Sequence, residues 1–129
     1  MSRKRIVMEQ QQKTIPELVE DFRKQPGVDI SRLAEGAKVI VETTQGVFEL
    51  TIQNPKHSLV RVNGTDPRLR AGISGQVFQS FYDIEGRIAV PYWIGKSLRM
   101  QISFKNGVYA CTPAVSARVE GPGWHYDVF

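Results

Sequence analysis

Apolar and polar side chains alternate with a period of two from residue 37 onward, the pattern of strands with one buried face. The clearest example surrounds Gln45-Gly46, a pair typical of a tight turn. With these two residues as the loop, Glu42 would stand opposite Glu49. One face of the hairpin then collects the bulky apolar side chains Val39, Val41, Phe48, Leu50 and Ile52. The sequence therefore predicts a half-buried antiparallel hairpin.

A second hairpin is predicted at Asn106-Gly107, the strongest short turn signal in the chain. A two-residue loop there would place Ile102 opposite Cys111, with both side chains pointing inward. Further strands are predicted at residues 59–62, 76–82, 87–90 and 115–119.

The turn before residues 87–90 leaves two registers open. A two-residue loop would place Asp83 opposite Ile88, and a three-residue loop would place Tyr82 there. In either register the chain has about six to seven short strands with no crossover helix between them. The predicted fold is therefore a mainly β protein, a small antiparallel β-barrel or roll in which closure hides the strand edges.

The first part of the chain follows a helical pattern instead. Thr14 and Glu17 have the spacing of a capping box, and a short helix over about residues 16–24 should follow and end at Pro26-Gly27. The predicted organisation is one domain with four parts: a flexible N-terminal segment (1–13), the helix and a lead-in turn (14–36), the β-barrel (37–120) and an aromatic C-terminal tail (121–129).

Four segments of the predicted barrel resemble a group of uncharacterised bacterial small β-barrel domains of the SH3-like kind. They are residues 36–43, 46–52, 93–95 and 112–115. The likeness covers roughly residues 33–119 and rests mostly on turn and core residues. The resemblance implies a fold and carries over no catalytic or binding residue.

Composition and charge describe an ordinary intracellular domain. The chain has 129 residues, a net charge of +4 and a single cysteine, so no internal disulfide can form. No stretch has the ~20 apolar residues of a membrane span, and no apolar run follows the charged start as in a secretory signal. We therefore expect a cytoplasmic protein without a membrane partner.

No residue pattern indicates catalysis, a cofactor, a metal or a small-molecule ligand. Cys111 is predicted to lie in the core, where a thiol is inert. His57 and His125 lack the spacing of metal ligands. Glu42 opposite Glu49 could form an acid/base pair, but an exposed position favours a solvated pair of carboxylates. We expect a non-enzymatic binding or scaffolding module.

Two surfaces are candidates for binding. The tail carries Trp124, Tyr126 and Phe129, which would contact a protein partner or a second copy, or else cover the chain's own barrel. The alternative is single-stranded nucleic acid, bound by a basic loop and a strand aromatic: Lys56, Arg61, Arg68, Arg70 and Trp93. Protein binding is favoured over nucleic-acid binding.

Overall fold

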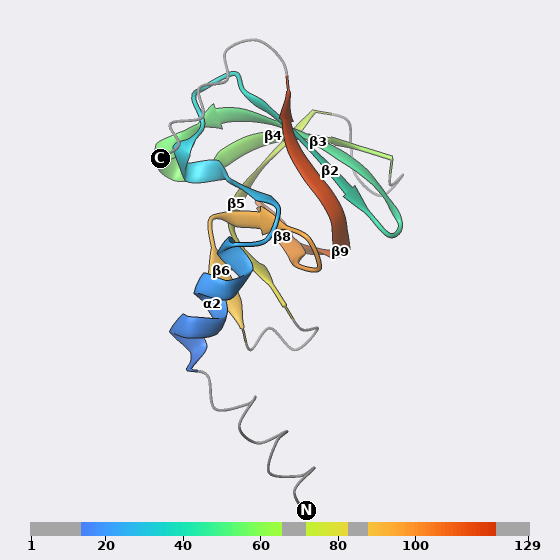
Figure 1. The fold of residues 1–129 in the computed structure, drawn as a ribbon. Coiled ribbons are helices and arrows are strands. Elements are labelled where there is room, and N and C mark those ends of the chain that lie inside the picture. The colour runs from blue at the N-terminus through green and yellow to red at the C-terminus, as the bar shows by residue number, and fades with distance from the viewer. Residues whose placement is uncertain (1–13, 66–71, 83–87, 121–129) are drawn as a thin grey trace, which may run out of the picture.

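The computed structural model describes residues 14–65, 72–82 and 88–120 (Figure 1). Its one α-helix among these residues is α2 (Ile15–Arg23), and two single 3-10 turns follow, η1 (Ile30–Arg32) and η2 (Pro55–His57). The strands are β1 (Gly27–Asp29), β2 (Lys38–Thr43), β3 (Gly46–Asn54), β4 (Leu59–Gly64), β5 (Ile73–Phe81), β6 (Ala89–Pro91), β7 (Trp93–Gly95), β8 (Arg99–Phe104) and β9 (Gly107–Glu120).

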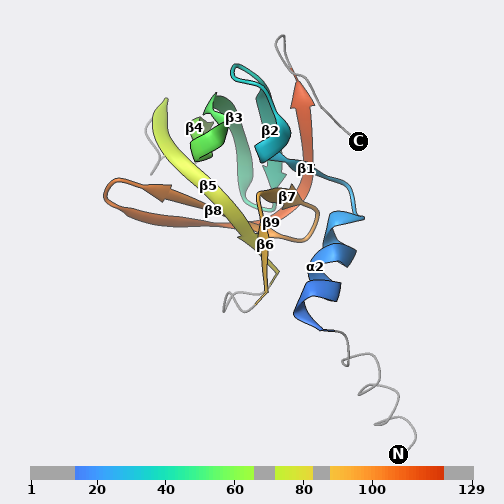
Figure 2. The same cartoon turned by 90° about the vertical axis from the view of Figure 1, so that its left-hand side faces the viewer.

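The helix begins as its sequence predicts. The Glu17 N–H donates to the Thr14 hydroxyl oxygen at 3.3 Å, and the Glu17 carboxylate accepts from the Thr14 N–H at 3.0 Å. This capping box satisfies two backbone donors that a helix start otherwise leaves unpaired. Although α2 is amphipathic, none of its residues is fully buried, and it lies outside the ring of strands (Figure 2).

The strands form a closed ring. Seven strands pair in the order β4-β3-β2-β9-β8-β5-β6, all antiparallel, and β4 also pairs with β5. Six strands, β2, β3, β4, β5, β8 and β9, therefore form a closed ring. Among the described residues, β6 pairs only with the end of β5, over Gln79–Phe81. The predicted small antiparallel barrel with a short N-terminal helix is confirmed.

A separate two-stranded ribbon, β1 paired with β7, contacts β5 and β9. The ribbon and the turn after it contribute Val28, Ile30, Leu33 and Ile94 to the same core as the barrel strands. Residues 29–36 were predicted as a turn or a single helical turn, which η1 confirms, whereas β1 was missed.

The period-two pattern correctly predicts which side chains are buried. Val39, Val41, Phe48, Leu50 and Ile52 are all buried on one face of the first hairpin. The predicted pairing is wrong by two residues, however, because Thr43 stands opposite Gly46 and Glu42 opposite Val47. The loop is Thr44-Gln45, since the Thr43 hydroxyl oxygen accepts from the Gln45 and Gly46 N–H groups at 3.2 and 3.1 Å.

The second hairpin shows the same two-residue shift. Phe104 stands opposite Gly107, and Ile102 stands opposite Tyr109 rather than Cys111. Gly107 has a φ of 150°, a conformation that favours glycine, and it is the first residue of β9 rather than the second residue of the loop. A shift of two residues leaves Ile102 and Cys111 on their predicted inward face.

Two further expectations are settled by the pairing. The Tyr82 N–H donates to the Ile88 carbonyl at 3.0 Å, so the register that places Tyr82 opposite Ile88 is the right one. The strand predicted at residues 115–119 is not separate, because β9 runs without interruption over 14 residues. The first part of β9 pairs with β8, and the part from Ala114 onward pairs with β2.

Candidate functional site

The carboxylate pair predicted at Glu42 and Glu49 does not form. Glu42 accepts from Arg118 at 3.2 Å, and Glu49 lies 3.9 Å from the Lys38 ammonium. Hydrogen bonds to Glu120 and then to Glu42 raise the pKa of Arg118 above its ordinary value, so this guanidinium stays charged. Each carboxylate therefore belongs to an exposed ion pair, and the acid/base interpretation is wrong.

Cys111 lies where the alternation predicts, in the core, with 3% of its surface exposed. Among residues 14–65, 72–82 and 88–120, no three His, Cys, Asp or Glu side chains are close enough to hold a metal ion.

The basic residues predicted to bind nucleic acid are only partly described. Lys56 in η2 and Arg61 on β4 are both exposed, whereas Arg68 and Arg70 lie outside the described residues. Arg61 stands opposite Ser74 of β5, beside Gly72. Trp93 belongs to the β1–β7 ribbon, so the structure places it and Arg61 in different sheets.

Trp93 has neighbours of its own. A Cβ on Gly27 would lie 2.7 Å from the indole ring, and one on Gly95 would lie 2.5 Å from Nε1, so only glycine fits at either position. The indole N–H is buried without a hydrogen-bond partner among the described residues. The Arg23 guanidinium lies 5.9 Å from the ring centroid, a cation–π distance. A stacking base would have to compete with Arg23.

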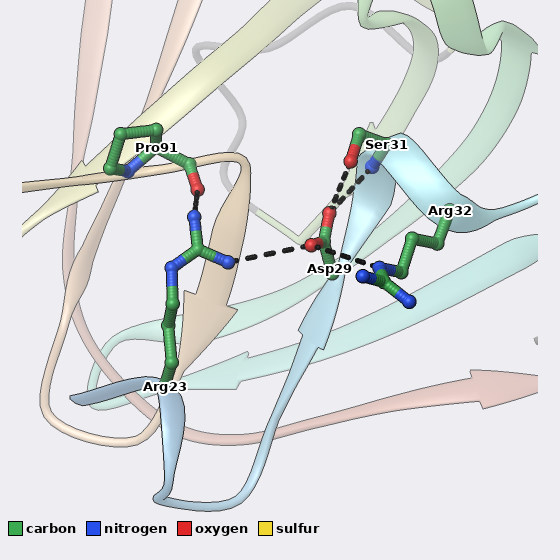
Figure 3. A network of polar contacts seen from close by, with 5 residues as sticks. All are labelled: Arg23, Asp29, Ser31, Arg32 and Pro91. Carbon is green, nitrogen blue, oxygen red and sulfur yellow. Dashed lines mark hydrogen bonds and ion pairs between the residues drawn. The ribbon is translucent and has the colours of Figure 1, made fainter. Parts of the chain in front are cut away.

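Arg23 is the centre of a polar network that joins α2 to the ribbon (Figure 3). It donates to the Pro91 carbonyl at 2.5 Å and to the Asp29 carboxylate at 3.4 Å. Asp29 is almost buried and also accepts from the Ser31 hydroxyl at 2.6 Å, with Arg32 at 3.7 Å. The carboxylate is thus fully engaged in holding η1 and α2, which indicates a structural role.

A hollow opens where β5 and β8 separate. Their ladder ends at the pair Gln76 and Ser103, and the β8–β9 hairpin continues past β5, away from the ring (Figure 2). A Cβ on Gly75 would lie 2.8 Å from the Phe104 ring, so this glycine lets the ring lie over β5. Beyond it lies a space of about 340 Å³, here named the β5–β8 hollow, lined by Ile73, Ser74, Phe104, Lys105, Val108, Tyr109 and the hairpin turn.

The lining of the β5–β8 hollow is largely apolar. The Tyr109 ring contacts the edge of Phe48, 6.1 Å between centroids, which joins the floor of the hollow to the core. Val108 at its margin is 61% exposed, the most exposed large apolar side chain that the structure describes. Lys105 supplies a cation at the rim. A volume in this range suits one large apolar side chain of a ligand.

β9 borders the hollow. Over Gly107–Thr112 it pairs with β8, and its pairing with β2 begins at Ala114. The sequence pattern did not reveal the hollow, and its only local signal was the strong turn at Asn106-Gly107.

The tail residues Trp124, Tyr126 and Phe129 lie outside the described residues, so their predicted contact with a partner or with the barrel stays a prediction. The tail begins after Glu120, which stands opposite Lys38 at the start of β2.

No family model, curated protein or solved structure matches the chain. The resemblance of residues 33–119 to SH3-like domains therefore stays a prediction, while the small barrel itself is confirmed. In the part of the chain that the structure describes, no helix has the length and apolar character needed to cross a bilayer.

Proposed function

We propose that the protein is a non-enzymatic binding module that holds an extended segment of a partner protein at the β5–β8 hollow. The observation that carries this proposal is an apolar space of about 340 Å³ beside β9, with Val108 61% exposed at its margin. A pocket of this kind can select one side chain of a bound segment.

The lining indicates the chemistry of the partner segment. Ile73, Phe104 and Tyr109 favour a large apolar or aromatic side chain as the anchor, because burying it removes apolar surface from water on both partners. Lys105 at the rim and the exposed Arg61 beside Ser74 favour an acidic residue close to that anchor. We therefore expect an extended peptide that combines an aromatic side chain with Asp or Glu.

Selection from a displayed library of random peptides tests this proposal. The full-length chain and a chain ending at Glu120 are panned in parallel, and the enriched peptides are titrated by fluorescence anisotropy. We expect Val108→Glu to weaken binding at least about tenfold. A carboxylate at the margin would repel the acidic residue of the peptide and would be unfavourable beside its apolar side chain.

Val115→Glu is the matched control. Val115 is also an exposed valine of β9, at 54%, but it does not line the hollow. The proposal fails if no peptide is enriched on either chain, or if both variants lose affinity equally.

Single-stranded nucleic acid is the second candidate, favoured by one observation. Arg61 stands opposite Ser74 of the hollow's lining, Lys105 belongs to that lining, and both cations are exposed beside its aromatic rings. Titration of a labelled oligonucleotide at increasing salt distinguishes it, since phosphate contacts must give an affinity that falls steeply with salt. Binding that is lost in Arg61→Ala and falls with salt would favour nucleic acid over the peptide.

A further inference from the structure

We infer that the tail, residues 121–129 of the same chain, occupies the β5–β8 hollow; this inference rests on the proposed function. Its basis is the chemistry of the tail and the place where the tail leaves the barrel.

The tail has the chemistry that the hollow favours. In an extended conformation Trp124, Tyr126 and Val128 share one face, and Asp127 lies between the last two in sequence. The Tyr126 and Val128 side chains match the apolar lining of the hollow, and Asp127, on the other face of the tail, matches the cation of Lys105 at the rim.

The other terminal segment lacks this complementarity. Residues 1–13 contain four Lys or Arg against one Glu and no aromatic residue. Their positive charge would be repelled by Lys105 and Arg61. Between the two terminal segments of the chain, the tail is therefore the suitable occupant.

The tail is also long enough to reach the hollow. Directly opposed residues in neighbouring strands lead from its root to the rim: Glu120, Lys38, Thr51, Arg61 and Ser74. Four strand spacings amount to about 19 Å along the sheet. Nine extended residues span about 30 Å, which leaves about 10 Å for passing over the outward side chains. Residues from Tyr126 onward therefore reach the hollow, whereas Trp124 is too close to the root.

Tethering favours the chain's own tail over the tail of a second copy. A short flexible link gives its segment an effective concentration in the millimolar range when the link spans the distance. A second copy competes only when the protein itself approaches that concentration.

Amide spectra of the full-length chain test the inference. Replacing the reaching side chains by Tyr126→Ser, Val128→Ser and Phe129→Ser should shift the backbone amides of Ser74, Lys105 and Val108, because the hollow is then vacated. His125→Ser, a substitution too close to the root of the tail to reach the hollow, is the control and should leave these amides in place. Changes restricted to the tail's own amides would overturn the inference. Differences that disappear on dilution would assign the hollow to a second copy and overturn it equally.

A competition experiment separates this inference from the proposed function. A synthetic peptide of residues 121–129 is titrated into the triple serine variant and into the unchanged chain. We expect at least about tenfold weaker binding to the unchanged chain, whose own tail competes. Equal affinity, together with Val108-dependent binding of displayed peptides, would leave the hollow as a peptide site and overturn only its occupation by the tail.

Discussion

Arg23 of α2 donates from Nη2 to the carbonyl oxygen of Pro91 at 2.5 Å, across 68 residues of sequence. The same guanidinium contacts Asp29 at 3.4 Å and lies over the Trp93 ring. Since α2 has no fully buried residue, these contacts and the stacking of Phe22 on Tyr82, 4.8 Å between centroids, hold the helix against the barrel.

We therefore expect Arg23→Ala to release α2 while the barrel stays folded. Loss of a charge-assisted hydrogen bond should lower stability by about 1 to 3 kcal/mol. Hydrogen exchange should show faster exchange of α2 amides and unchanged protection of β2 and β3. Lys24→Ala, at the exposed neighbouring position, is the control. Unchanged exchange in α2 would show that the apolar contacts alone suffice.

The Thr43 hydroxyl holds the turn of the first hairpin, and we expect it to fix the register. It accepts from two N–H groups of the turn and donates to the Gly46 carbonyl at 2.9 Å. Thr43→Val keeps the shape and β-branching but removes these bonds, so we expect a loss of about 1 to 2 kcal/mol in urea unfolding. Thr51→Val in the same hairpin should change stability little. If both variants behave alike, the register is set elsewhere.

Cys111 should be protected from thiol reagents in the native protein. Its side chain is buried, so labelling requires opening of the barrel, and the labelling rate should follow the fraction unfolded as urea is added. Cys111→Ser should cost about 1 to 3 kcal/mol because it buries a hydroxyl in the core. Rapid labelling without urea would contradict the core position and reopen the question of a reactive thiol.

Gly75 should not tolerate a larger residue. A Cβ there would lie 2.8 Å from both Ile102 Cγ2 and the Phe104 ring. Gly75→Ala should therefore lower stability by about 1 to 3 kcal/mol, measured by urea unfolding, and should also displace the Phe104 ring that lines the hollow. Ser74→Ala, at the adjacent exposed position, should have a smaller effect. Equal effects would mean that the ring moves aside without cost.

The sequence predicts which side chains are buried better than it predicts which residues pair. Side chains alternate with a period of two, so a register error of two residues leaves the buried face unchanged. Both hairpins are shifted by two residues from the predicted registers, which keeps Val41 and Ile102 inward but separates Glu42 from Glu49. The predicted acid pair depended on the register of the first hairpin, whose turn the Thr43 hydroxyl holds by accepting from the Gln45 and Gly46 N–H groups.

The features that sequence reasoning missed depend on distant parts of the chain. β1 has only three residues, and its partner β7 begins at Trp93. The hollow exists because β5 and β8 separate beyond Gln76 and Ser103, and no local pattern in either strand specifies that separation. Arg61, predicted to bind nucleic acid together with Trp93, is exposed on β4, but Trp93 lies in the other sheet.

Closure of the ring depends on β9, which pairs with β8 and with β2. During translation, β2 emerges from the ribosome about 70 residues before its second neighbour, so one side of it stays bare until that neighbour is made. A polypeptide truncated before β9 would expose the unpaired edges of both β2 and β8. Chaperones or proteases must remove such a product before it aggregates.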